Sequence, residues 1–121
     1  MRNILFRGKR LDNEEWVYGS LLLIENLAYI YDGDSCPSEV NFEYEFIAVD
    51  PATVGQYTGL RDRAGEMIWE GDILSDGAFT YEVRYKGTGF VTILYGHVYT
   101  MDTRPTKIVI GNIHDNPDLL K

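Results

Sequence analysis

The chain has 121 residues, 45% of them hydrophobic and 13% aromatic, which predicts one compact domain with a packed core and excludes global disorder. Its longest apolar run, Leu21-Leu22-Leu23-Ile24, is too short to span a membrane, and no signal peptide is visible, so we expect a cytoplasmic protein without a membrane partner. The formal net charge of −8 disfavours docking of the whole molecule on nucleic acid, which requires a basic face.

The charge is unevenly distributed along the chain. Between Leu11 and Leu60 there is no Lys or Arg, whereas ten acidic residues occur there: Asp12, Glu14, Glu15, Glu25, Asp32, Asp34, Glu39, Glu43, Glu45 and Asp50. Such a stretch affects partner choice and solubility rather than fold. We take Glu39, Glu43, Glu45 and Asp50 as a candidate interaction surface.

The first half of the chain predicts short strands joined by turns. The expected strands are Ile4 to Gly8, Trp16 to Leu21, Leu27 to Tyr31 and Phe42 to Val49. Glu25-Asn26 predicts a hairpin turn, and Asp50-Pro51 ends the last strand because proline cannot donate to a β-ladder. The residues from Asp32 to Asn41 are the most loop-like segment.

The second half continues the same pattern. We expect strands at Val54 to Leu60, Met67 to Trp69, Asp72 to Leu74, Phe79 to Tyr85, Phe90 to Leu94 and Lys107 to Ile113. Arg61 to Glu66 predicts a polar turn, Glu70-Gly71 a bend or bulge, and Lys86 to Gly89 a hairpin loop. In the strand from Phe79, the alternation predicts inward side chains at Phe79, Tyr81, Val83 and Tyr85. One helical turn is expected from Asn116 to Leu120.

These elements predict a mainly β protein with little helix, built as a small barrel or as two packed sheets. We expect an N-terminal β region at residues 1–52 and a barrel region at residues 53–121. The glycines Gly55 and Gly59 suit positive φ angles or close backbone approach, and Asp72 can cap exposed amides.

Four ordered motifs make the chain similar to the YopX-like proteins of bacteriophages and prophages. The motifs are Phe6 to Leu11 with Glu15 to Gly19, Val54 to Asp62, Ile68 to Ile73, and Ile110 to Pro117. The resemblance covers nearly the whole chain. It implies an SH3-like barrel in the C-terminal half and a phage or prophage origin, but it implies no activity and no catalytic residues.

No group of residues predicts a particular chemistry. Cys36 is flanked by acidic residues, whereas a reactive thiol needs an electropositive setting. His97 and His114, with Asp102 or Asp115, lack paired-histidine metal spacing, and Gly87-Thr88-Gly89 lacks the helix and lysine of a phosphate loop. Glu43 and Glu45 are more simply a solvated strand face. We therefore predict a protein that is not an enzyme and has no catalytic, cofactor or metal site.

Three functions remain open. The first is a protein–protein interaction module whose partner is an unknown host or phage protein, or a second copy of the chain. The second is an acidic decoy that occupies nucleic-acid-binding proteins of the host. The third is single-stranded nucleic-acid binding by aromatic and basic residues of the C-terminal half. The candidate contacts for this third function are Tyr57, Arg61, Arg63, Arg84 and Lys86.

Overall fold

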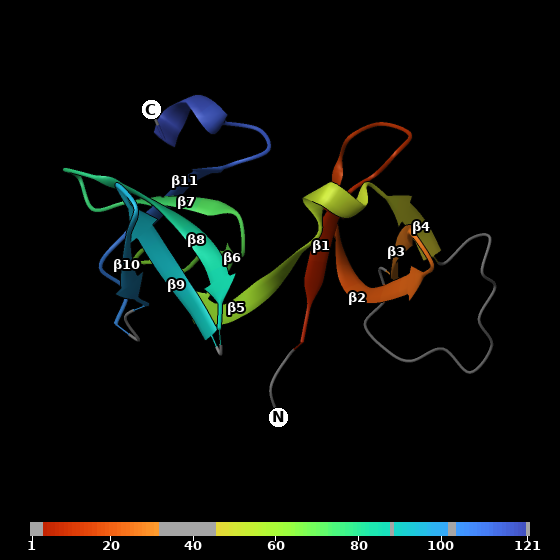
Figure 1. Ribbon diagram of the computed structural model, residues 1–121, viewed down its shortest axis with the longest axis horizontal. Coiled ribbons are helices and arrows are strands. Elements are labelled where there is room, and N and C mark those ends of the chain that lie inside the picture. The colour runs from red at the N-terminus through yellow and green to blue at the C-terminus, as the bar shows by residue number, and fades with distance from the viewer. Residues whose placement is uncertain (1–3, 32–45, 88, 102–103, 121) are drawn as a thin grey trace. The chain divides into compact units, whose positions relative to one another are not determined.

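The computed structural model describes residues 4–31, 46–87, 89–101 and 104–120. The described residues form β-strands and turns with two short 3-10 helices, so the expectation of a mainly β protein is confirmed (Figure 1). The chain divides into two compact units, Met1–Gln56 and Tyr57–Lys121. The boundary between them falls within strand β5, Gly55–Arg61.

The first unit contains an antiparallel sheet in the order β4-β3-β2-β1, extended by the start of β5. Its elements are β1 (Phe6–Lys9), β2 (Trp16–Ile24), β3 (Leu27–Tyr31), β4 (Phe46–Val49) and the 3-10 helix η1 (Pro51–Thr53). Ile24 pairs with Leu27, which confirms the two-residue hairpin turn expected at Glu25-Asn26. The beginning of the strand expected from Phe42 lies outside the described residues.

The core of this unit forms because apolar side chains recur on one face of each strand. Val17, Ala28, Ile30 and Val49 are buried together. Gly8 in β1 lies against Val49, and a Cβ atom at Gly8 would lie 2.9 Å from Val49 Cγ2. A glycine at this position therefore allows the backbone of β1 to approach β4.

The outer side of β4 is occupied by the residues that follow β1. Arg10 forms an antiparallel bridge with Val49, and the Asp50 N–H donates to the Lys9 carbonyl over 2.8 Å. The Asp50 carboxylate accepts from the Ala52 N–H at 3.0 Å and begins η1. The edge of this sheet is therefore closed by the chain itself.

The second unit contains a five-stranded antiparallel sheet and a separate strand pair. In the sheet the order is β10-β9-β8-β7-β11, and the second part of β5 pairs with β6 (Figure 1). The strands are β6 (Met67–Trp69), β7 (Asp72–Ser75), β8 (Thr80–Lys86), β9 (Gly89–Leu94), β10 (His97–Thr100) and β11 (Ile108–Asn112). The terminal 3-10 helix η2 (Pro117–Leu120) confirms the expected helical turn.

Ile68, Leu74 and Val83 form the buried core of the second unit, with Met101 and Val109 packed against it. The inward positions expected in β8 are only partly correct. Val83 is buried, but Phe79 and Tyr85 are exposed, because Phe79 precedes the strand and Tyr85 pairs with Phe90 at the turn end of the β8–β9 hairpin. No closed barrel is found among the described residues, so the SH3-like barrel is not confirmed.

Strand β10 is the one described strand in this unit that the sequence does not predict. It pairs with β9 in regular register, from His97 opposite Leu94 to Thr100 opposite Val91. All four of its residues are exposed. A strand without a buried face lacks the alternation on which a sequence-based prediction depends.

Candidate interaction surface

The polar residues of the family-like motifs bind the backbone of the chain itself. Asp62 is 3% exposed, and its carboxylate accepts from the N–H groups of Ala64 (2.9 Å), Glu66 (2.8 Å) and Val109 (2.9 Å). Burial opposes ionisation of this group, but the backbone donors outweigh burial and lower the pKa of Asp62. This aspartate therefore fixes the turn from Arg61 to Glu66 against β11.

Two other motifs have the same structural role. The Asp72 carboxylate accepts from the Trp69 N–H at 2.8 Å, across a bend whose Gly71 has φ 92°. The capping role predicted for Asp72 is therefore confirmed. In the closing motif, Asn112 Oδ1 accepts from the N–H groups of His114 (3.0 Å) and Asp115 (2.9 Å). The motifs that resemble the family thus account for turns rather than for a reactive site.

The residues named as nucleic-acid contacts do not form one described cluster. Arg84 donates two hydrogen bonds to Glu82, at 2.6 and 3.0 Å, and this bonding raises the pKa of Arg84. Arg61 donates to the Gly65 carbonyl at 2.9 Å, and the Tyr57 ring packs at 5.5 Å from Trp69. Arg63 and Lys86 are exposed.

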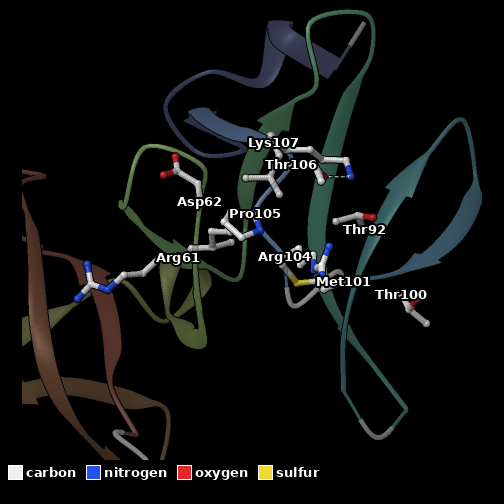
Figure 2. Close-up of a pocket in the computed structure, with 11 residues that line it drawn as sticks. Arg61, Asp62, Thr92, Thr100, Met101, Arg104, Pro105, Thr106 and Lys107 are labelled. Carbon is white, nitrogen blue, oxygen red and sulfur yellow. Dashed lines mark hydrogen bonds between the residues drawn. The ribbon is translucent and has the colours of Figure 1, made fainter.

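A small cavity beside the β5–β6 turn has three basic residues of this unit in its lining. It has a volume of about 20 Å³, which is room for about one water molecule rather than for a base or a nucleotide. Arg61, Arg104 and Lys107 contribute to its lining, but Arg61 points away from the other labelled residues (Figure 2). The Lys107 ammonium lies 4.7 Å from the Tyr81 ring centroid.

Most of the acidic residues proposed as an interaction surface lie outside the residues that the structure describes. Glu39, Glu43 and Glu45 lie outside the described residues, as does Cys36. Asp50 is described, and its carboxylate caps η1. Within the described residues, no three His, Cys, Asp or Glu side chains gather as a metal site requires. No described helix is long and apolar enough to cross a membrane.

The turn between β9 and β10 presents an aromatic side chain in an unfavourable backbone conformation. Leu94 pairs with His97, so Tyr95 and Gly96 form a two-residue hairpin turn with φ angles of 49° and 79°. Such turns favour Asn, Asp or Gly, because a bulky side chain at positive φ is strained. Tyr95 is nonetheless 82% exposed, so burial contributes little to offset this strain.

A broad hollow lies beside this turn on the outer face of β8, β9 and β10. Its volume is about 340 Å³, and its apolar lining includes Ile93, Tyr95, Val98 and Leu120. The polar side is formed by the outward residues of β8, among them the paired Glu82 and Arg84. Phe79 meets the edge of the Tyr95 ring at a centroid distance of 6.4 Å. An open, half-apolar hollow is better suited to binding a side chain or a chain segment of a partner than to serving as an enclosed active site.

The hairpin surface, which we define as Tyr95, Val98 and Leu120, is not predicted from the sequence. Val98 and Tyr99 are 47% and 48% exposed, but Tyr99 lies on the opposite face of β10, where its ring centroid is 6.3 Å from that of Tyr81. One signal was available, because Tyr95-Gly96 stands between apolar residues where a turn rich in Asn, Asp or Gly is typical. An aromatic residue at such a turn position suggests a function, but the periodicity of polar and apolar residues does not reveal it.

Comparison with known proteins agrees with the resemblance seen in the motifs. A solved structure, protein EF1440 from Enterococcus faecalis, is similar to this chain with a TM-score of 0.66 and 26% sequence identity, and 100% of each chain is covered. No curated protein matches. A family model described as YopX protein matches residues 5–121. On this match the chain belongs to the YopX family.

Proposed function

We propose that the protein is a non-enzymatic protein–protein interaction module that binds its partner through the hairpin surface. The observation that carries the proposal is Tyr95, a large aromatic residue held at φ 49° and 82% exposed. Residues in strained backbone conformations cluster at functional sites, and aromatic residues often provide much of the binding energy of interfaces. The adjoining hollow offers apolar area to a docked segment.

The family resemblance supports a setting for this module. We propose that it acts in the cytoplasm of a bacterial cell that carries a bacteriophage or prophage, where the partner is a host or phage protein or a second copy of the chain. An SH3-like arrangement of the second unit also remains a proposal, motivated by its short antiparallel strands. The alternatives of an acidic decoy and of single-stranded nucleic-acid binding have less support, since Arg84 is paired with Glu82 and Asp50 caps η1.

Site-directed photo-crosslinking tests the proposal. A photoreactive phenylalanine analogue replaces Tyr95 in one variant and Leu23 in a control variant, because Leu23 is 63% exposed and lies in the first unit. Both variants are irradiated in a lysate of the bacterium that carries the gene. We expect a discrete adduct from position 95 and not from position 23. The captured protein is then purified and titrated against the wild type and Tyr95→Asn, for which we expect at least tenfold weaker binding.

Two outcomes contradict the proposal. One is the same pattern of adducts from positions 95 and 23, which indicates adventitious contact. The other is unchanged affinity of the purified partner for Tyr95→Asn.

A further inference from the structure

The five-stranded sheet of the second unit has two edges, and only one of them is covered by described residues. Along β11, the Val109 N–H donates to the Asp62 carboxylate at 2.9 Å, and the Lys107 carbonyl just before the strand accepts from the Arg63 N–H at 2.9 Å. At the other edge, β10 pairs with β9 on one side. No further strand among the described residues pairs with its other side.

Strand β10 is only four residues long, but it lacks the other features by which proteins usually prevent edge pairing. Besides shortness, exposed edges are commonly protected by charged residues, by proline or by a bulge. The sequence His97-Val98-Tyr99-Thr100 contains no Lys, Arg, Asp, Glu or Pro, and its register with β9 is regular. Strand β11, in contrast, has an irregular register between Val109 and Gly111. The backbone of β10 is therefore a regular template for another strand.

We propose that the occupant of this edge is the β10 strand of a second copy of the chain, so that two five-stranded sheets join as one antiparallel sheet. This inference rests on the proposed function, because it names a partner for the same hairpin surface.

Charge favours a second copy over a charged partner. From Gly87 to Met101 the chain has no charged residue, so two copies of this edge meet without local repulsion. The nearest charges on the outer face of β8 include Glu82 and Arg84, which already bind each other. A partner selected by charge thus finds little to recognise here, whereas the apolar Val98 and Tyr99 side chains can pack against their own copies.

The geometry of the pairing is restricted by the alternation of side chains along β10. A two-fold axis that keeps both sheet faces continuous must pass midway between the two copies of one residue, because side chains directly opposite each other share a face. The central residue of the pair is then Val98 or Tyr99. Opposed Cα atoms in antiparallel pairs are about 4.5 to 5.5 Å apart, which is within the range that a disulfide bridges.

Sedimentation over a wide range of protein concentration tests the proposal, with Val98→Lys as the disrupting variant. Ile110→Lys is the matched control, because it adds the same charge at an exposed apolar position on the covered edge. We expect the wild type and Ile110→Lys to form dimers reversibly, and Val98→Lys to dimerise at least tenfold more weakly. Far-ultraviolet circular dichroism and thermal unfolding establish that both variants are folded.

Salt provides a second readout. Each copy carries a net charge of −8, so screening weakens repulsion between copies. We expect the dimer fraction to rise with ionic strength. A dimer held by complementary charges shows the opposite trend.

Disulfide trapping locates the contact independently of Val98→Lys. In a Cys36→Ser background, Val98→Cys, Tyr99→Cys and the control Ile110→Cys are oxidised mildly. We expect a covalent dimer from position 98 or position 99 and none from position 110. A monomer at all concentrations, equal dimerisation of both lysine variants, or trapping only at position 110 overturns the inference. If these tests fail while position 95 still captures a different protein, the inference alone is wrong and the proposed function stands.

Discussion

Three backbone N–H groups point at the carboxylate of Asp62, and this arrangement is typical of how polar residues are used in the protein. A buried amide without an acceptor destabilises the fold, so a single acidic side chain can hold a turn and a strand together. Asp72 and Asn112 act in the same way. At the scale of residues, the motifs shared with the family thus encode backbone geometry.

Asp62→Ala is expected to lower the free energy of unfolding by about 1–3 kcal/mol, because the half-buried Val109 N–H loses its acceptor. Ala64 and Glu66 are exposed, so water can replace the carboxylate at their N–H groups and their loss adds less. Urea denaturation measures the change. The control is Asp12→Ala, which removes an exposed ion pair with Arg10 and should leave the unfolding free energy nearly unchanged. Equal effects of the two substitutions contradict the role assigned to Asp62.

The lowered pKa of Asp76 predicts how the stability of the folded protein depends on pH. Hydrogen bonds from the N–H groups of Phe79 and Ala78 and from the Tyr81 hydroxyl lower its pKa to about 2, from an ordinary 3.8. Because the pKa is lower in the folded state, the stabilisation is complete above about pH 4 and is lost as the pH falls through about 2. Thermal unfolding between these pH values should depend less on pH in Asp76→Asn. An NMR-measured pKa of Asp76 at or above 3.8 contradicts this reading.

Tyr95→Asn separates stability from binding. Asparagine tolerates positive φ better than tyrosine, so we expect the free energy of unfolding to stay the same or rise by up to about 1 kcal/mol. Binding to the captured partner should weaken at the same time. Glu25→Asn is the control, since Glu25 has φ 54° in the β2–β3 turn and should show the same relief without loss of binding. A Tyr95→Asn variant that is clearly less stable would show that Tyr95 serves the fold.

At the scale of elements, strands with a buried face could be predicted from the sequence and β10 could not. Strand β2 alternates buried and exposed residues, and its hairpin with β3 follows from Glu25-Asn26. Strand β10 has neither a buried face nor an alternation of polar and apolar residues. From the sequence, Asp62 could be assigned only to a polar turn, because its hydrogen bond with the Val109 N–H joins residues 47 positions apart. Long-range hydrogen bonds of this kind leave no local pattern.

Gly8→Ala tests the close approach of β1 to β4. The added methyl would lie 2.9 Å from Val49 Cγ2, and overpacking of this kind costs about 1–3 kcal/mol. Gly89→Ala is the control, since a Cβ atom there meets nothing within 4 Å. In a double-mutant cycle, Val49→Ala should relieve part of the cost of Gly8→Ala. Additive effects of the two substitutions would show that the contact between these residues is not the cause.

At the scale of the whole molecule, the fold and the surface follow from different parts of the sequence. The family motifs specify the turns of two β units, and the sheets leave one uncharged edge uncovered among the described strands. The acidic stretch that the sequence offered as an interaction surface lies largely outside the described residues, so that interpretation stays a prediction. The hairpin surface is the feature of the described chain for which the fold itself offers no explanation.

Hydrogen–deuterium exchange of the β10 amides is the sharpest test of whether the β9–β10 hairpin is a binding surface, because strand addition protects the backbone that it covers. Exchange is compared in dilute and in concentrated protein, and with the partner captured through position 95. We expect added protection confined to Tyr95 through Met101, either in concentrated protein or in the complex with the captured partner. Unchanged exchange in this segment in both states, or protection that appears only elsewhere, would contradict this expectation.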